Sequence, residues 1–178
     1  MYQLLSARRS VRKYTDRLVS EDQVDQLIRS ILRSPSGNNI NPWEVIYLDD
    51  LALVESLADA KANGAKFLKG AKQCLVVLAD ETKTDVWIED ASIAMTIGHL
   101  VAADLGLGSC WIQIRERKTA SGESSEAFVR RLLSIPEHMR VLALLAFGYP
   151  DEEKSGHPEE KLQKEKIYKN GYANRYYK

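Results

Sequence analysis

The stretch Ser34-Pro35-Ser36-Gly37-Asn38-Asn39-Ile40-Asn41-Pro42-Trp43 is the most informative part of the chain. Two prolines bracket a run that consists almost entirely of turn-forming residues. Gly37 lets the backbone approach a ligand closely, and the asparagines offer both hydrogen-bond donors and acceptors. The stretch therefore predicts either a ligand-binding loop or an ordinary turn between two elements.

A second polar stretch, Arg8-Arg9-Ser10-Val11-Arg12, carries three guanidiniums. Arg8 and Arg12 project to one side whether the segment is extended or helical. Two guanidiniums held together repel each other unless an anion lies between them, and their planar forks suit phosphate. The segment therefore predicts an anion site, with a solvated basic turn as the alternative.

A third stretch, Gly106-Leu107-Gly108-Ser109-Cys110-Trp111-Ile112-Gln113, runs from a glycine turn into an apolar strand. It is not a dinucleotide-binding fingerprint, because the third glycine is missing and a helix precedes it. The chain also lacks the glycine- and lysine-containing loop of nucleotide triphosphatases and the GxSxG motif of serine hydrolases.

Metal binding and side-chain catalysis find no support in the sequence. The histidines, His99, His138 and His157, have no ligand-like spacing to one another or to the cysteines. Cys74 and Cys110 lie in apolar runs and are expected to be buried hydrophobes rather than reactive thiols. His99 is expected to be a core or interface histidine rather than a catalyst. We therefore predict neither a metal site nor a catalytic side chain.

Length and charge restrict the class of protein. A chain of 178 residues fits one domain. Its 25 Lys and Arg balance its 25 Asp and Glu, which argues against nucleic-acid binding, because such surfaces carry a basic excess. The sequence shows no signal peptide and no apolar run of membrane-spanning length. We therefore expect a cytoplasmic protein without nucleic-acid or membrane partners.

Apolar spacing predicts helices and strands arranged around one sheet. Ser20-Glu21-Asp22-Gln23 has the form of a capping box, and the amphipathic helix that follows should end at Ser34-Pro35. Further helices are expected over 51–62, 85–105 and 123–133, and strands over 44–48, 74–79, 110–114 and 141–147. The helix over 85–105 is so apolar that it is either buried centrally or shared with a second subunit.

The composition changes beyond Pro150. The tail is rich in Lys, Glu and Tyr and poor in aliphatic residues, so it cannot fold by itself. It is expected either to remain mobile or to lie over another surface, such as that of a neighbouring subunit. The sequence therefore predicts an α+β domain over 1–150 and a tail over 151–178 that packs on the domain or on a partner.

Together these stretches resemble the nitroreductase family of FMN-dependent oxidoreductases. The family pattern Arg-Arg-Ser-x-Arg-x-aromatic corresponds to residues 8–14, and the pattern Ala/Ser-Pro-Ser-x-x-Asn-x-Gln-Pro-Trp corresponds to residues 34–43. The pattern Gly-Leu-Gly-x-x-Trp-Ile-Gly corresponds to residues 106–113. Asp90-Ala91-Ser92-Ile93-Ala94 and Phe147-Gly148-Tyr149-Pro150 are similar to the family as well. The likeness covers about residues 6–150.

The resemblance implies an intertwined homodimer with a central mixed β-sheet flanked by helices. One FMN would lie in each of two clefts that both chains build. Arg8 and Arg12 would hold its phosphate and ribityl chain, and the backbone N–H of Gln113 would face flavin N5. The implied FMN-binding residues are Arg8, Arg9, Ser10, Arg12, Pro35, Ser36, Gly37, Asn39, Asn41, Trp111, Ile112, Gln113 and Lys161.

Three of these residues depart from the family pattern. Asn41 stands where the family usually has Gln, and Gln113 stands where it usually has Gly or Glu. Lys161 replaces an Arg of the tail, so a planar fork becomes a point charge.

The resemblance also implies an activity. NADH or NADPH would reduce the flavin, and a small acceptor such as a nitroaromatic, quinone or enone would then be reduced in a ping-pong cycle. Two alternatives remain: another flavin chemistry on the same fold, such as dehalogenation or flavin cleavage, and a flavin-binding or regulatory module without redox turnover.

Overall fold

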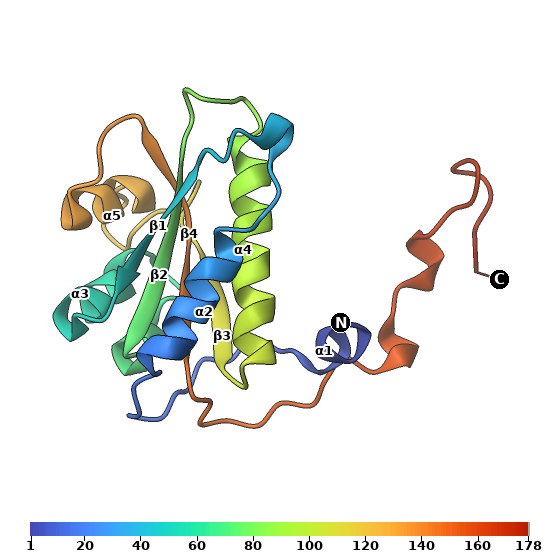
Figure 1. Ribbon diagram of the computed structural model, residues 1–178, viewed down its shortest axis with the longest axis horizontal. Helices are drawn as coiled ribbons and strands as arrows, with labels where there is room; N and C mark the ends of the chain where they lie inside the picture. Colours follow the sequence, from blue (N-terminus) through green and yellow to red (C-terminus); the bar gives the residue numbers. More distant parts are fainter. Residues whose placement is uncertain (178) are drawn as a thin grey trace.

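A four-stranded β-sheet forms the centre of the computed structural model, which describes residues 1–177 (Figure 1). β2 and β4 are the central strands, and β1 and β3 are the edges. Every residue of β2 is buried, which explains its almost uninterrupted apolar sequence. The strands are β1 (Trp43–Leu48), β2 (Gln73–Asp80), β3 (Gly108–Gln113) and β4 (Met139–Gly148), in spatial order β1-β2-β4-β3.

The pairing of the strands differs from the expected mixed sheet. All three strand pairs are antiparallel, and the parallel pairing found within residues 1–177 is an isolated bridge between Ser10 and Ser109. A strand covered by helices on both faces has the same apolar run in either direction, so its sequence does not reveal its orientation. The α+β class itself is confirmed.

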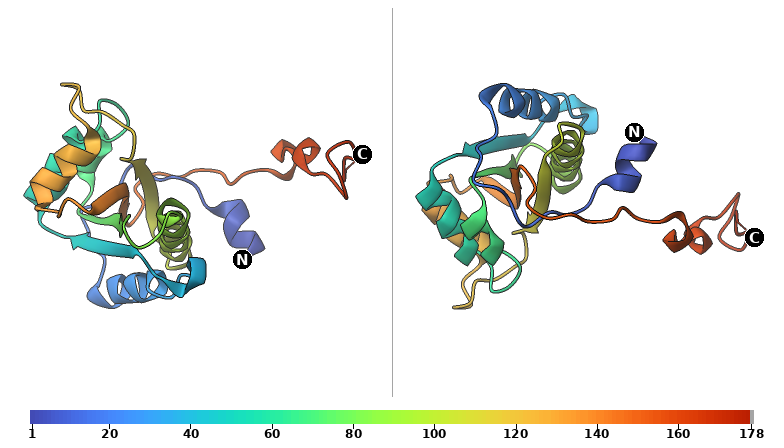
Figure 2. Two further views of the ribbon diagram at one scale, coloured as in Figure 1. Left: turned by 90° about the horizontal axis from the view of Figure 1, so that it is seen from above. Right: turned by 90° about the horizontal axis from the view of Figure 1, so that it is seen from below.

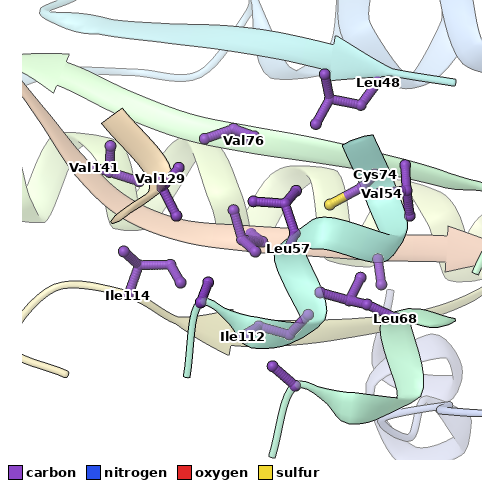
Figure 3. Packing of buried hydrophobic residues seen from close by; sticks show 14 of the residues in the cluster. Leu48, Val54, Leu57, Leu68, Cys74, Val76, Ile112, Ile114, Val129 and Val141 are labelled. Atoms are coloured by element: carbon purple, nitrogen blue, oxygen red, sulfur yellow. The ribbon is translucent and has the colours of Figure 1, made fainter. Parts of the chain in front are cut away.

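Helices cover both faces of the sheet (Figure 2). α2 (Glu21–Ile31) and α4 (Trp87–Asp104) lie on one face, where Leu27, Met95 and Phe147 belong to one buried cluster. α3 (Leu51–Ser56) and α5 (Ser125–Leu133) lie on the other face. Figure 3 shows the second cluster there, in which Leu57, Leu68, Val76, Ile112 and Val129 are buried together. Two separate apolar clusters therefore hold the three layers together.

The predicted helix boundaries are confirmed except in the segment over 51–62. Ser20 caps α2 as expected, because its Oγ accepts from Gln23 N at 3.4 Å. α3 ends at Ser56, and a 3-10 turn over Leu57–Asp59 continues the chain. Ser56 Oγ donates to Ala52 O at 2.7 Å, a local bond that weakens the continuation of a helix.

A short helix, α1 (Tyr2–Ala7), pairs with the tail, and we call α1 and residues 151–177 together the arm. α1 was not predicted, because it has six residues and none of them is buried. Its partner is the tail, whose His157 N donates to Ser6 O at 2.8 Å, while a side chain at Gly156 would collide with that same oxygen. Figures 1 and 2 show the arm projecting from the body of the molecule.

Both cysteines are buried, as predicted. Burial also raises the pKa of both the Cys74 and Cys110 thiols, which favours the unreactive protonated form. Within residues 1–177, no helix has the length and apolar content needed to cross a bilayer.

Candidate functional site

The arginine segment, residues 8–12, follows the start of edge strand β3. Val11 N donates to Ser109 O at 3.0 Å, and Val11 packs against Gly108, where any side chain would collide with it. Arg8 follows the last residue of α1 and is half-buried. It lines a surface pocket of about 250 Å³ whose apolar wall includes Val11 and Leu107. The segment therefore presents Arg8 on the side of the sheet that α4 covers.

Arg12 lies on the opposite side. Its guanidinium carbon is 5.9 Å from the centre of the Phe67 ring, which packs on the face covered by α3 and α5. The expected meeting of Arg8 and Arg12 is therefore not found within one chain. The backbone crosses the edge of the sheet between the two residues, and Arg12 N is anchored by donation to Glu152 Oε1 at 2.5 Å.

The tail holds the arginine segment from outside. Lys154 Nζ donates to Ser10 O at 2.6 Å, and Arg9 Nη1 donates to Ser155 O. The Arg12 N–H and the Lys154 ammonium hold the pKa of the Glu152 carboxyl at about 2. Arg9 is thus engaged by the tail, the Ser10 carbonyl is engaged by Lys154, and the Ser10 side chain contacts Cys110.

The loop over residues 34–42 turns sharply between α2 and β1. Asn38, Asn39 and Asn41 have φ values of 51°, 58° and 50°, in the left-handed region that Asn tolerates better than most residues. Ser36 Oγ accepts from Asn41 N at 2.9 Å and donates to Asn41 Oδ1 at 2.8 Å. Pro35, Asn39 and Asn41 are exposed. The fold thus gathers the expected loop residues on one surface.

Asp90 of α4 fixes the middle of this loop. Its Oδ1 accepts from Gly37 N at 2.8 Å, and the residue is 3% exposed. Its Oδ2 is buried without a hydrogen-bond partner among residues 1–177. This oxygen therefore retains unused acceptor capacity.

The outer edge of β3 offers backbone donors. Ile114 N donates to Leu142 O at 3.2 Å, and Gln113 lies opposite Ala143. Hydrogen-bonded pairs alternate along an antiparallel ladder, so the N–H groups of Trp111 and Gln113 point away from β4. Within residues 1–177, no strand pairs with this edge after the bridge at Ser109. The predicted backbone donor at Gln113 is therefore available.

The side chains of β3 divide between the two faces. Trp111 Nε1 donates to Gln113 Oε1 at 2.9 Å, and both residues are half-buried. Ile112 is 1% exposed and belongs to the core on the opposite face. The Ile112 side chain is therefore not available to a ligand, and its N–H points toward β4. The side chain of Gln113 has a definite role in this chain, since it fixes the indole of Trp111.

His99 of α4 connects the arginine segment to β3. Its Nδ1 lies 2.5 Å from Ser109 Oγ, and its Nε2 lies 2.9 Å from Arg8 Nη1. Burial, followed by the positive charge of Arg8, lowers the pKa of His99 to about 4. The imidazole is therefore neutral at pH 7.

The loop and the arginine segment lie at different places on α4. Asp90, which holds the loop, and His99, which contacts Arg8, are nine positions apart in the sequence. This separation is about two and a half helical turns, so the two contacts are about 14 Å apart along the axis and on opposite sides of the helix. None of the hydrogen bonds within residues 1–177 joins the loop to residues 8–12.

Lys161 lies apart from both. It is exposed in the 3-10 turn Glu159–Lys161, which Tyr2 contacts through a 2.8 Å hydrogen bond to Glu159. Tyr2 begins α1 and Arg8 follows its end, so the chain does not bring Lys161 to its own Arg8.

Five residues that organise the site were not predicted from the sequence. They are Asp90, His99, Ser109, Glu152 and Lys154. Asp90 and Ser109 lie within stretches that carry the family resemblance, which was an available signal. Their contacts, however, join residues as far apart as 53 positions for Gly37 with Asp90 and 144 positions for Ser10 with Lys154. No local spacing encodes such pairs.

The fold and these groups define a class: an α+β protein with a guanidinium, an amide loop and an open strand edge placed around one central helix. Comparison with known proteins identifies it. Residues 5–149 match the nitroreductase family. The chain belongs to this family.

Two similar proteins cover almost all of the chain. A solved structure of an FMN-dependent nitroreductase from Clostridium difficile R20291 superposes with a TM-score of 0.94 and 38% identity, over 97% of this chain and 100% of that chain. A protein of Archaeoglobus fulgidus, provisionally named NADH dehydrogenase/NAD(P)H nitroreductase, is 32% identical over 85% of this chain and 86% of its own length.

A more distant relative has a different activity in its name. Human iodotyrosine deiodinase 1 is 24% identical over 85% of this chain and 62% of the deiodinase.

Proposed function

We propose that this chain is an FMN-dependent oxidoreductase that uses NADH or NADPH to reduce a small acceptor such as a nitroaromatic, a quinone or an enone. The observation that carries the proposal is the pairing of a half-buried guanidinium at Arg8 with an open strand edge at Gln113, in a member of the nitroreductase family. When bound, FMN supplies the two-electron chemistry, and the residues of the protein bind and orient it.

The donor set fits the phosphate end of FMN. A guanidinium has five N–H donors, and the contact of Arg8 with His99 engages one of its two terminal nitrogens. The remaining donors can bind phosphate through paired, charge-assisted hydrogen bonds. The Ser10 hydroxyl lies two residues further along the same segment.

The ring end of FMN fits the loop and the open strand edge. Asn39 and Asn41 are exposed amides that can both donate and accept, as a uracil-like ring edge requires. The N–H of Gln113 is fixed by the pairing of β3 with β4, so it can stabilise a negatively charged reduced ring without reorganisation. Trp111, held by Gln113, borders the same edge.

A second copy of the chain would complete each site. The loop and the arginine segment are on opposite sides of α4, so a two-fold pair can oppose the loop of one chain to the arginine segment of the other. Exposed apolar residues are available for such a seam, among them Ile40, Val86 and Ile93 beside the loop and at the start of α4. In such a homodimer, the remaining loop residues, Pro35, Ser36 and Gly37, would contact the FMN in the partner's site.

The proposal assigns the two parts of the chain different tasks. Residues 1–150 would form the FMN-binding domain. The tail over 151–178, of which Lys178 lies outside the described residues, would pack on the domain through residues 152–157 and on the partner beyond them. The arm exposes apolar side chains that a partner could cover, including Leu5, Ile167 and Tyr172. Lys161 would then reach the phosphate in the partner's site. Arg12 would contribute to phosphate binding only after its side chain turns away from Phe67 on dimerisation.

No side chain is assigned as a general acid or base. His99 is neutral and engaged at both ring nitrogens, and the cysteines are buried. Reductant and acceptor would use the same exposed side of the bound cofactor in turn, which gives ping-pong kinetics.

The visible spectrum of the purified protein tests the proposal. The protein, loaded with FMN and freed of excess, should show flavin absorbance that anaerobic NADH or NADPH bleaches and that a nitroaromatic or quinone restores. FMN mixed with serum albumin provides the control for slow bleaching by unbound flavin. A protein that takes up no FMN contradicts the assignment of the site.

Two other functions are separated by a related assay on the reduced protein. Dehalogenation, which the deiodinase relative favours, would show as release of halide from a halogenated phenol. A flavin-binding module without turnover would bind FMN that neither NADH nor NADPH bleaches.

A further inference from the structure

The Arg8 side chain contacts the body of the molecule through one hydrogen bond, to the ring of His99. Arg8 follows α1, a six-residue helix that has no buried residue, and its neighbour Arg9 is held by the tail of the arm. The contact from Arg8 Nη1 to His99 Nε2 instead reaches α4, the 18-residue helix whose inner face lies in the core. The orientation of the Arg8 guanidinium thus depends on His99.

The chemistry of this contact fixes the tautomer of the imidazole. A guanidinium has donors only, so His99 Nε2 must accept and carries no proton. The proton of the neutral ring is therefore on Nδ1, which donates to Ser109 Oγ. Ser109 is 2% exposed at the start of β3, where the bridge to Ser10 also lies, so the acceptor for this proton is rigidly placed.

We propose that His99 is a positioning residue for the cofactor: anchored by Ser109, its imidazole holds the Arg8 guanidinium in the orientation that receives the FMN phosphate. This inference rests on the proposed role of Arg8 in FMN binding. A residue that is oriented before binding loses less side-chain freedom on binding, and this raises affinity without any contact between His99 and the ligand.

A double-mutant cycle tests the coupling between the two residues. FMN dissociation constants are measured on apo-protein by quenching of flavin fluorescence, for the wild type, Arg8→Ala, His99→Leu and the double variant. We expect about 10- to 100-fold weaker binding for Arg8→Ala and about 5- to 20-fold weaker binding for His99→Leu. The double variant should bind within about twofold of Arg8→Ala, because His99 has no role once Arg8 is absent.

Two further variants separate positioning from folding. In His99→Gln the amide can accept from Arg8 and donate to Ser109, so this variant should bind FMN within about twofold of the wild type. His138→Leu, at an exposed histidine in another part of the fold, is the matched control and should not change affinity. If His99→Leu does not fold, the nitrogen chemical shifts of the His99 ring in the wild-type apo-protein decide the matter, since Nε2 must be the unprotonated nitrogen.

The outcomes distinguish this inference from the proposed function. Wild-type affinity in Arg8→Ala would overturn the phosphate assignment and with it the basis of the positioning role. Weak binding by Arg8→Ala together with wild-type binding by His99→Leu, or additive losses in the double variant, would overturn the positioning role alone. A proton on Nε2 would also overturn it.

Discussion

The two ends of α4 hold their functional segments in different ways. At its start, the loop over residues 34–42 is closed by its own hydrogen bonds and anchored by the buried carboxylate of Asp90. Near its end, the arginine segment connects the projecting arm to β3: Val11 N donates to Ser109 O, and the Arg8 side chain contacts the neutral ring of His99. The loop is held by its own hydrogen bonds and by α4, whereas the arginine segment is held by β3, by His99 and by the tail.

The placement of the loop and the arginine segment on α4 explains why one chain does not bring them together. The two segments face opposite sides of α4 and are about 14 Å apart along it, so they belong to different surfaces. In the proposed homodimer, two-fold symmetry would place each loop opposite the partner's arginine segment and thereby build two equivalent sites. The helix would then act as a spacer between two half-sites.

The largest effect is expected at the arginine end. Arg8→Ala removes a charge-assisted donor and should weaken FMN binding by about 1.5–3 kcal/mol, with little change in the unfolding temperature, because the side chain is only half-buried. Equilibrium fluorescence titration of apo-protein measures the affinity. Arg17→Ala, whose guanidinium stacks 4.2 Å from the Tyr149 ring, is the matched control and should bind FMN normally. Equal losses in both variants would indicate a general charge effect and contradict the assignment.

At the loop end, we expect affinity and stability to change together. Asp90→Ala leaves Gly37 N without its acceptor and should cost about 1–3 kcal/mol of folding free energy, with several-fold weaker FMN binding. Chemical denaturation of apo-protein and FMN titration measure the two effects. Asp90→Asn keeps an acceptor oxygen for Gly37 and should retain most of both. Unchanged stability in Asp90→Ala would show that the loop is not anchored there.

The pH dependence of stability should report on His99. Its native pKa of about 4 is below the value of about 6.5 in an unfolded chain, so the unfolded state binds more protons between these values. The free energy of unfolding should therefore fall as the pH drops from 6.5 toward 4. Above pH 6.5, titration of His99 should not change it. With allowance for partial exposure, the loss at pH 5 is about 1–2 kcal/mol. Urea unfolding of the wild type and of His99→Gln at pH 7.5 and pH 5 isolates the contribution of His99. An equal loss of stability in both proteins would contradict the prediction.

The smallest effect is expected for the tail. Lys161 is exposed and supplies a point charge instead of a fork, so Lys161→Ala should weaken FMN binding by about two- to threefold, and less at high salt. The same titration at low and high salt measures it. Lys169→Ala, further along the arm, is the control, and an equal change in both variants would remove Lys161 from the site.

Sequence was sufficient for the parts that depend on local pattern. Apolar periodicity gave the four strands and the principal helices, since core faces repeat with the period of the element. It did not predict α1, because that helix buries nothing and is held by residues about 150 positions away, as in the hydrogen bond from His157 to Ser6. It also did not show that Arg8 and Arg12 face opposite sides, because the crossing of the sheet edge is a tertiary feature.

Mixed dimers test the central claim most directly. Differently tagged Arg8→Ala and Asp90→Ala chains are produced together, and dimers that carry both tags are purified and titrated with FMN. If each site combines the arginine segment of one chain with the loop of the other, one site of the mixed dimer holds both changes and the other is intact. The account therefore predicts one wild-type-affinity FMN site per mixed dimer. A mixed dimer with no such site, in which both sites bind as weakly as in the parent variants, would contradict it.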